Sequence, residues 1–250
     1  MVRVAVLSDI HGNLAALRAV FDDVHRQGPD LIVCAGDLVV YGPFPNECVN
    51  LIRARKIATV AGNRDWAVGS RQSPEAYAVP AGRERAAEVA IYEWTTGVVT
   101  EANRQFLSAL PRKLRLRLNQ VELLLVHGTH RSSFEYLRFT DDPAVFAELA
   151  ETAKADVIVG GHTHVPYRKE AGETLFLNAG SVGWPKDGHP NACYLLVEVT
   201  GHDVRSEFRR VPYPVEETVA ALHRFGLPDT LGRALSCGTE MSPRPRPCPK

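Results

Sequence analysis

The sequence has no excess of charge of either sign, because 29 Lys and Arg residues balance 29 Asp and Glu residues in a chain of 250. A net charge of zero gives no overall field to attract a polyanion, which argues against a nucleic-acid partner. No apolar run approaches the roughly 18 residues that a membrane-spanning helix needs. We therefore expect a protein that acts on neither nucleic acid nor membranes.

Cysteine is scarce, and its five positions show no paired spacing. Cys34 and Cys193 lie inside apolar runs, which is typical of buried reduced thiols. Met1 leads directly into such a run, without the charged leader and small-residue cleavage site of a secretory signal. These features predict a cytoplasmic protein.

Short apolar runs alternate with helical patterns over the first 65 residues, which predicts a mostly parallel sheet with right-handed crossovers there. At 45% hydrophobic residues, the chain can bury a full core. The expected strands are 2–8, 31–35, 58–61, 114–118, 122–126, 157–159, 175–177, 194–199 and 203–211. The expected helices are 13–27, 47–55, 83–96, 101–110, 143–153 and 215–225. We predict one domain over residues 1–235 with a helical insert at about 66–112, followed by a disordered tail at 236–250.

Seven candidate metal ligands occur in five short motifs, each just past the end of an apolar run. The motifs are S-D-I-H-G, A-G-D-L, A-G-N-R-D, V-H-G and G-G-H-T-H, and they supply Asp9, His11, Asp37, Asn63, His127, His162 and His164. A sheet can gather such strand ends along one edge, although they are far apart in sequence. Two carboxylates, one amide and four imidazoles meeting there would hold two metal ions.

This ligand set contains no thiolate, so it suits Mn, Fe, Zn, Co or Ni in a reactive site better than a structural zinc. Asp37 can bridge two ions with its two oxygens, whereas Asn63 supplies one carbonyl oxygen. Two ions about 3.5–4 Å apart would activate a bridging water and clamp both the attacking and the leaving oxygens of a displacement at phosphorus. The residues thus indicate hydrolysis of a phosphate ester.

The ordered series D-x-H, G-D, G-N-x-D, H-G, G-H-x-H resembles that of the calcineurin-like metallophosphoesterases, over roughly residues 2–200. The segments S-D-I-H-G-N-L, G-D-L-V-x-Y-G-P-x-P and N-A-G-S-V-G resemble the compact bacterial and archaeal phosphodiesterase branch. The resemblance implies an α/β fold, a four-layer α-β-β-α sandwich of two mixed β-sheets flanked by helices. It also implies that one metal is held by Asp9, His11, Asp37 and His164, and the other by Asp37 (bridging), Asn63, His127 and His162.

One position departs from the family pattern. Many members read G-N-H, where the His steadies the transition state or protonates the leaving oxygen, but this chain has Arg64 there. An arginine is no general acid near neutral pH because its pKa exceeds about 12, yet it can donate two hydrogen bonds to a phosphoryl group. The alternative is that Arg64 pairs with Asp65 on the surface. His130 is the nearest candidate for delivering a proton, and Arg131 is a candidate phosphate contact.

The function predicted from these observations is hydrolysis of a phosphodiester in a small phosphate-ester substrate, through a hydroxide that bridges the metals. We expect two divalent ions, with manganese preferred over Fe, Zn, Ni or Co. The alternatives are a phosphomonoesterase, including a protein or dinucleoside-polyphosphate phosphatase, and a non-catalytic scaffold of the same fold. The oligomeric state stays open.

Overall fold

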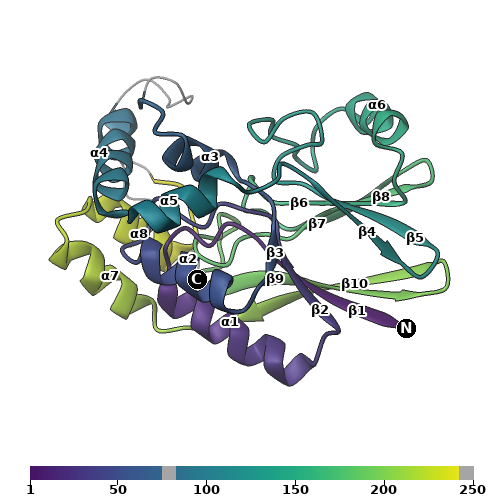
Figure 1. Cartoon of the computed structure of the whole chain (residues 1–250), viewed down its shortest axis with the longest axis horizontal. Coiled ribbons are helices and arrows are strands. Elements are labelled where there is room, and N and C mark those ends of the chain that lie inside the picture. The colour runs from purple at the N-terminus through teal and green to yellow at the C-terminus, as the bar shows by residue number, and fades with distance from the viewer. Residues whose placement is uncertain (75–82, 242–250) are drawn as a thin grey trace.

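The computed structural model describes residues 1–74 and 83–241 and contains two five-stranded sheets (Figure 1). The first sheet has the order β10-β9-β1-β2-β3, with β1 (Val2–Leu7), β2 (Leu31–Cys34), β3 (Ala58–Thr59), β9 (Ala192–Thr200) and β10 (Asp203–Val211). The second has the order β4-β5-β6-β8-β7, with β4 (Leu114–Leu118), β5 (Val121–Leu125), β6 (Val157–Gly160), β7 (Tyr167–Ala171) and β8 (Thr174–Asn178). Both sheets are mixed, because parallel central strands carry antiparallel neighbours.

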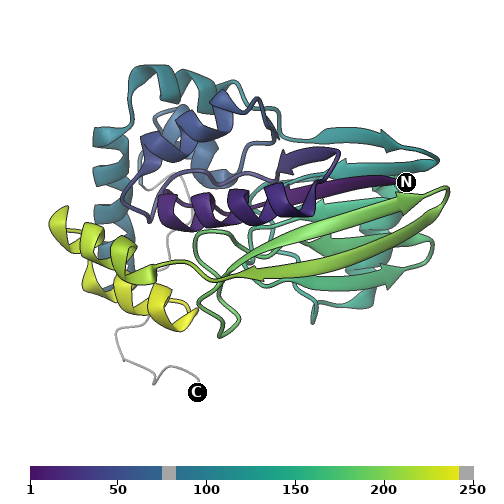
Figure 2. The same ribbon diagram turned by 90° about the horizontal axis from the view of Figure 1, so that it is seen from below.

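Helices lie outside the two sheets and beyond one end of their strands (Figure 1). They are α1 (Leu14–Gln27), α2 (Pro45–Ala54), α3 (Asn63–Gly69), α4 (Arg83–Val98), α5 (Glu101–Ser108), α6 (Pro143–Ala153), α7 (Val215–Arg224) and α8 (Asp229–Cys237). Helix α6 packs Phe146 and Leu149 against Ile158 and Phe176 of the second sheet. Helix α1 lies along the outer face of the first sheet (Figure 2). The predicted four-layer α-β-β-α sandwich is confirmed.

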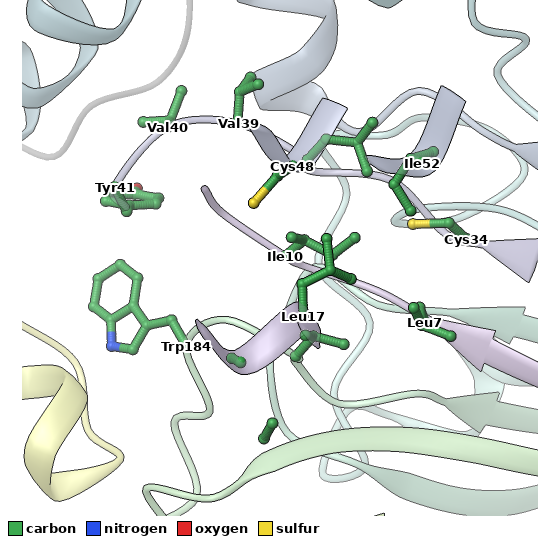
Figure 3. Close-up of a cluster of buried hydrophobic side chains, with 14 of the residues drawn as sticks. Leu7, Ile10, Leu17, Cys34, Val39, Val40, Tyr41, Cys48, Ile52 and Trp184 are labelled. Carbon is green, nitrogen blue, oxygen red and sulfur yellow. The ribbon is translucent and has the colours of Figure 1, made fainter. Parts of the chain in front are cut away.

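The alternation of side chains along β1 explains how the layers hold together. Val4 and Val6 point between the two sheets and pack in one apolar cluster with residues such as Leu123. Leu7, on the other face, packs with Leu17 of α1 in the cluster drawn in Figure 3. Because successive side chains of a strand point to opposite faces, one strand contributes to two separate cores. Burial on both faces accounts for the near-continuous apolar run at the start of the chain.

Three elements are absent from the sequence prediction. Strand β7 is a sheet-edge strand whose polar residues alternate with buried ones, so its composition is that of an exposed loop. Helix α3 begins at Asn63, inside a segment interpreted only as a ligand motif. Helix α8 follows Pro228 and lies beyond 215–225, the last helix predicted from the sequence. Propensity is overridden here by tertiary contacts.

The predicted tail is wrong at its first residues. Ser236 and Cys237 end helix α8, and Met241 is buried in the cluster beneath the first sheet's helices. The rest of the predicted tail, 242–250, lies outside the described residues. The predicted burial of Cys34 and Cys193 as free thiols is confirmed.

No helix within residues 1–74 and 83–241 is long and apolar enough to cross a membrane.

Candidate metal centre

The seven predicted ligands lie together at the carboxyl ends of parallel strands. They follow β1 (Asp9, His11), β2 (Asp37), β3 (Asn63), β5 (His127) and β6 (His162, His164). Strands β1 and β2 run parallel in register, and so do β5 and β6, so their ends reach one edge. The loops are tied together there, since the Asp9 amide donates to the Gly36 carbonyl at 2.9 Å. Six of the seven residues form two buried groups of three possible ligands.

The first group consists of Asp9, His11 and His164. Asp9 Oδ1 lies 3.2 Å from His164 Nε2 and 3.6 Å from His11 Nε2. The two imidazole Nε2 atoms are 3.1 Å apart. Ligand atoms that each lie about 2.1 Å from one ion are roughly 3 Å from one another, so this spacing suits a shared metal ion.

The second group consists of Asp37, His127 and His162, with Asn63 beside it. His127 Nε2 lies 3.1 Å from His162 Nδ1, 3.4 Å from Asp37 Oδ2 and 3.0 Å from Asn63 Oδ1. All four side chains are buried. The second group is thus as closely spaced as the first, and it contains the amide oxygen that the sequence suggested.

Asp37 stands between the two groups. Its Oδ2 atom is 3.4 Å from His127 Nε2 and 3.8 Å from His11 Nε2, whereas its Oδ1 atom accepts the Arg64 amide at 2.8 Å. The sequence suggested that both oxygens of Asp37 would serve two ions. In the structure one oxygen faces both groups, and the other fixes the carboxylate to the start of α3.

The tautomers of the four histidines follow from their hydrogen bonds, because a backbone carbonyl can only accept. The Nδ1 atoms of His11, His127 and His164 lie 3.1, 2.8 and 2.6 Å from the carbonyls of Val39, Ala35 and Trp184. Each of these rings therefore carries a proton on Nδ1 and turns its Nε2 atom toward the cluster. His162 is reversed, since its Nε2 lies 3.3 Å from the Phe134 carbonyl and its Nδ1 faces His127. This pattern of carbonyl partners is typical of metal-binding histidines.

The Asp9 carboxylate provides a direct test of whether these residues fit a metal ion. Its Oδ2 atom accepts from the Ser8 hydroxyl at 2.6 Å and from the His162 amide at 3.0 Å. Its Oδ1 atom is buried without a hydrogen-bond donor. Buried carboxylate oxygens are rarely left without a donor, and this one faces two imidazole lone pairs that also need a partner. A cation among these atoms satisfies all of them, so the residues fit a metal.

The backbone at this edge is held in an unusual conformation. Five of the ligands have a positive φ between 48° and 65°, namely Asp9, His11, Asp37, His162 and His164. Residues other than glycine adopt this left-handed region rarely, and clusters of them are found at functional sites. Space is equally restricted, because a Cβ atom on Gly161 would come within 2.4 Å of Asp9 Oδ2. The loops are therefore shaped around the ligands.

Burial and neighbouring charges set the protonation of the cluster. Burial lowers the pKa of His162 to about 3, with the charge of His127 acting in the same direction, so His162 is neutral as a ligand must be. Burial and Lys186 lower the pKa of His164 to about 4. Burial also opposes ionisation of Asp37, but the nearby His127 and His11 outweigh it and hold the pKa of Asp37 below its usual range. Burial disfavours a charge on His127, but Asp37 outweighs burial and raises the pKa of His127 to about 9, so a metal ion would have to displace a proton from this ring. The site thus offers ionised carboxylates and neutral imidazoles at His162 and His164.

Asp65, the last residue of A-G-N-R-D, supports this arrangement from behind. Its carboxylate accepts from the amides of Asp37 at 2.7 Å, Leu38 at 2.8 Å and Gly62 at 3.1 Å. Burial raises the pKa of Asp65 to about 7, and the charge of Asp37 adds to the effect. Asp65 thereby joins the loop after β2 to the loop after β3 and fixes the position of Asp37.

Arg64 is buried, which rules out the alternative that it pairs with Asp65 on the surface. The Arg64 guanidinium donates to the Tyr41 hydroxyl at 2.6 Å and pairs with Glu88 of helix α4 at 3.3 Å. Tyr41 also packs its ring edge-on to His11, with centroids 4.9 Å apart. Arg64 therefore sits next to the first ligand group, held there by a carboxylate from the predicted insert.

His130 and Arg131 are turned to other partners. His130 Nε2 lies 3.0 Å from the hydroxyl of Thr152 on α6. Arg131 forms ion pairs with Glu135 and, at 2.7 Å, with Glu148. Neither contact is to a metal ligand, so the structure gives the predicted proton donor and phosphate contact no position at the cluster.

A residue of the same loop that sequence reasoning passed over lies at the cluster instead. The Tyr136 ring is stacked on His162, with centroids 3.9 Å apart and planes at 28°. Its signal in the sequence was weak, because a tyrosine nine residues beyond His127 has no motif. Trp184 was also passed over. Its ring packs edge-on to His164 with centroids 5.7 Å apart, and its backbone carbonyl accepts from His164 Nδ1 at 2.6 Å.

Comparison with known proteins agrees with this geometry. The profile of the calcineurin-like phosphoesterase superfamily domain matches residues 2–202. An uncharacterized protein of Methanocaldococcus jannaschii is 32% identical, covering 94% of this chain and 98% of that protein. The phosphodiesterase YfcE of Escherichia coli is 28% identical, covering 78% and 88%. The crystal structure of a metallophosphoesterase from Sphaerobacter thermophilus matches with 30% identity and a TM-score of 0.77, covering 95% and 99%.

Proposed function

This chain belongs to the calcineurin-like phosphoesterase superfamily, and we propose that it hydrolyses the phosphodiester bond of a small substrate with the help of two divalent metal ions. The observation that carries the proposal is the position of Asp37 Oδ2 between two groups of buried ligands. A single carboxylate oxygen facing both groups suits two neighbouring ions better than two independent sites. We expect Mn²⁺ to be preferred, with Fe, Zn, Ni and Co as alternatives.

We assign Asp9, His11, His164 and Asp37 to one ion, and Asp37, Asn63, His127 and His162 to the other. When bound, the ions would supply a water-derived nucleophile at neutral pH and positive charge for the phosphoryl oxygens. The residues of the chain position the ligand atoms. The carbonyls behind three of the histidines hold the lone pairs in place, and Asp65 holds Asp37.

Arg64 contributes a permanent positive charge beside the site. Because a guanidinium stays protonated, Arg64 can oppose negative charge that develops on the phosphate but cannot transfer a proton to the leaving oxygen. Its pairing with Tyr41 and Glu88 limits the side chain to one orientation. We therefore expect good leaving groups to be turned over faster than poor ones.

The similarity to the phosphodiesterase YfcE of Escherichia coli supports the preference for diesters. A pair of substrates tests this preference. With Mn²⁺ present, rates are compared on a bis-aryl phosphate and the matching mono-aryl phosphate. Faster turnover of the diester is expected. Much faster turnover of the monoester would instead assign the protein to the phosphomonoesterases, including protein or dinucleoside-polyphosphate phosphatases.

A non-catalytic scaffold of this fold is separated from an enzyme by metal analysis. We expect protein purified without chelator, then dialysed against micromolar Mn²⁺ or Zn²⁺, to hold about two ions per chain. Less than about one ion per chain, together with no turnover of either ester, would favour the scaffold. The seven ligand positions are all occupied by residues able to bind metal, which supports the enzyme.

A further inference from the structure

Loop 126–142, between β5 and α6, brings one aromatic side chain to the ligand cluster. The Tyr136 ring stacks on the imidazole of His162 at 3.9 Å. Two residues earlier, the Phe134 carbonyl lies 3.3 Å from His162 Nε2. The loop is thus attached to a metal ligand both through its backbone and through a ring. The position of the loop is therefore tied to that of His162.

Tyr136 is unusual for a packed aromatic residue because 45% of it is exposed. Its ring stacks on His162, and the guanidinium carbon of Arg138 lies over the ring at 4.9 Å from the centroid. The side chain is therefore held at a residue of the ligand cluster while part of it still reaches solvent.

The hydroxyl of Tyr136 also has no hydrogen-bond partner among residues 1–74 and 83–241. Hydroxyls of other tyrosines in the protein do bind a partner, as when Tyr167 donates to the Leu137 carbonyl at 3.0 Å and Tyr194 donates to Asp23 at 2.8 Å. A phenol whose ring is stacked on a residue of the ligand cluster and whose donor is unused is suited to a ligand oxygen. A phosphate ester bound at the cluster would present such oxygens.

We propose that Tyr136 contacts the substrate, donating a hydrogen bond from its hydroxyl to an oxygen of the phosphate group. The inference rests on the proposed function, since it names a further residue of the same site. Loop 126–142 would then contact the substrate through Tyr136, and not through His130 or Arg131 as predicted from the sequence. Those two residues contact Thr152 and two glutamates instead. A neutral donor here complements Arg64, because it contributes direction without adding charge next to two cations.

The test compares Tyr136→Phe with wild type. Phenylalanine keeps the ring on His162 and removes only the hydroxyl, so bound Mn²⁺ per chain should stay the same. We expect kcat/KM for a bis-aryl phosphate to fall roughly 10- to 100-fold, as for loss of a hydrogen bond to a charged group. Phe139→Leu is the matched control, because Phe139 is an exposed aromatic of the same loop that packs on Tyr167. It should keep wild-type kinetics.

A second measurement is binding of inorganic phosphate to the Mn²⁺-loaded proteins by calorimetry, which needs no turnover. We expect weaker binding in Tyr136→Phe than in wild type or Phe139→Leu. Equal phosphate affinity and equal kcat/KM in Tyr136→Phe and wild type would overturn the role of Tyr136 while leaving the phosphodiesterase intact. Weaker phosphate binding without turnover in any variant would support the contact but contradict the proposed enzyme. Wild-type protein that binds metal but no phosphate would overturn both.

Discussion

Two buried clusters in this protein contain aspartate, and they differ in what satisfies the carboxylate. Asp23, on helix α1, accepts from Tyr194 at 2.8 Å, Arg26 at 3.0 Å and Arg209 at 3.3 Å, so protein donors reach both of its oxygens. Asp9 has a buried oxygen that no donor reaches, and imidazole lone pairs face it. Protein donors satisfy both oxygens of Asp23, whereas one oxygen of Asp9 lacks a donor and needs a cation from outside the protein.

This difference separates a structural ion pair from a functional site more sharply than burial or perturbed pKa does. The pKa of both aspartates lies below the usual range despite burial, Asp23 because of its hydrogen bonds and Asp9 mainly because of His164 and His11. Perturbed pKa values are found in both kinds of cluster. Convergent lone pairs are found only in the second of these two. The following variants test the comparison, from the largest expected effect to the smallest.

Replacement of Asp37 by Asn, or of His162 by Ala, should reduce kcat/KM for a bis-aryl phosphate by about 10³-fold or more. Each change removes a ligand, and a metal ion contributes several kcal/mol of transition-state stabilisation. Circular dichroism should show an unchanged fold. Asp23→Asn is the matched control, and it should keep its activity at neutral pH. An Asp37→Asn enzyme with more than a tenth of wild-type activity would contradict the bridging role.

Removal of metal should destabilise the wild-type protein. Ions that bind only the folded state stabilise it by about 2.7 kcal/mol at a free concentration one hundred times the Kd. A chelator should therefore lower Tm, and added Mn²⁺ should restore it. Asp23→Asn should show the same shift between the two conditions, whereas His162→Ala should show a smaller one. An identical Tm with and without chelator would mean that the cluster holds no ion under these conditions.

Asp65→Asn should weaken metal binding without removing a ligand. The variant keeps one acceptor oxygen for three amides, so Asp37 loses part of its support. Loss of such an outer partner costs about 10- to 100-fold in metal affinity. Titration with Mn²⁺ would measure it. Asp156→Asn is the control, because Asp156 also accepts a backbone amide, from Glu122 at 2.7 Å, but lies in the turn before β6. Its metal affinity should be that of wild type.

Asp23→Asn should have the smallest effect, and that effect should depend on pH. The folded-state pKa of Asp23 lies below its unfolded value of about 3.9, so its ionised form stabilises the protein above that pH. We expect a loss of about 1–2 kcal/mol of unfolding free energy at pH 7. The difference from wild type should shrink as pH falls below about 4, because wild-type Asp23 then becomes protonated. Urea unfolding at pH 7 and pH 3 measures both. A difference that stays constant would contradict the assigned cause.

The ligand edge could be predicted from sequence because it depends on local order along the chain. Each ligand follows the end of a strand by two to four residues, and neighbouring parallel strands end at a common edge. The two mixed sheets, by contrast, were predicted from the family resemblance, because the alternation of strands and helices indicated only a mostly parallel sheet over the first 65 residues. Strand β7 and helix α8 escaped prediction. The strand is mostly polar, and the helix, although Leu231, Ala234 and Leu235 are spaced for one buried face, is short and follows the turn residues Gly226 and Pro228.

The substrate side of the site could not be predicted, because contacts between distant segments decide it. Distance along the chain favoured His130, yet the loop turns it to Thr152 and brings Tyr136 to His162. The motif located Arg64 next to the ligands, but it did not indicate that its guanidinium pairs with Glu88, which is 24 residues away on α4. No periodicity in residues 66–112 indicates which carboxylate of that segment would reach the cluster.

The left-handed backbone of the ligand loops has a consequence for how the protein responds to heat. Each such residue costs on the order of 1–3 kcal/mol, whereas the sheets behind them are regular. Regions of low local stability open before the rest of a domain does. Without metal, the three loops that contain these residues, after β1, β2 and β6, should therefore unfold at a lower temperature than the two packed sheets. On warming, the metal-free protein would lose the structure of the ligand loops before that of the two sheets.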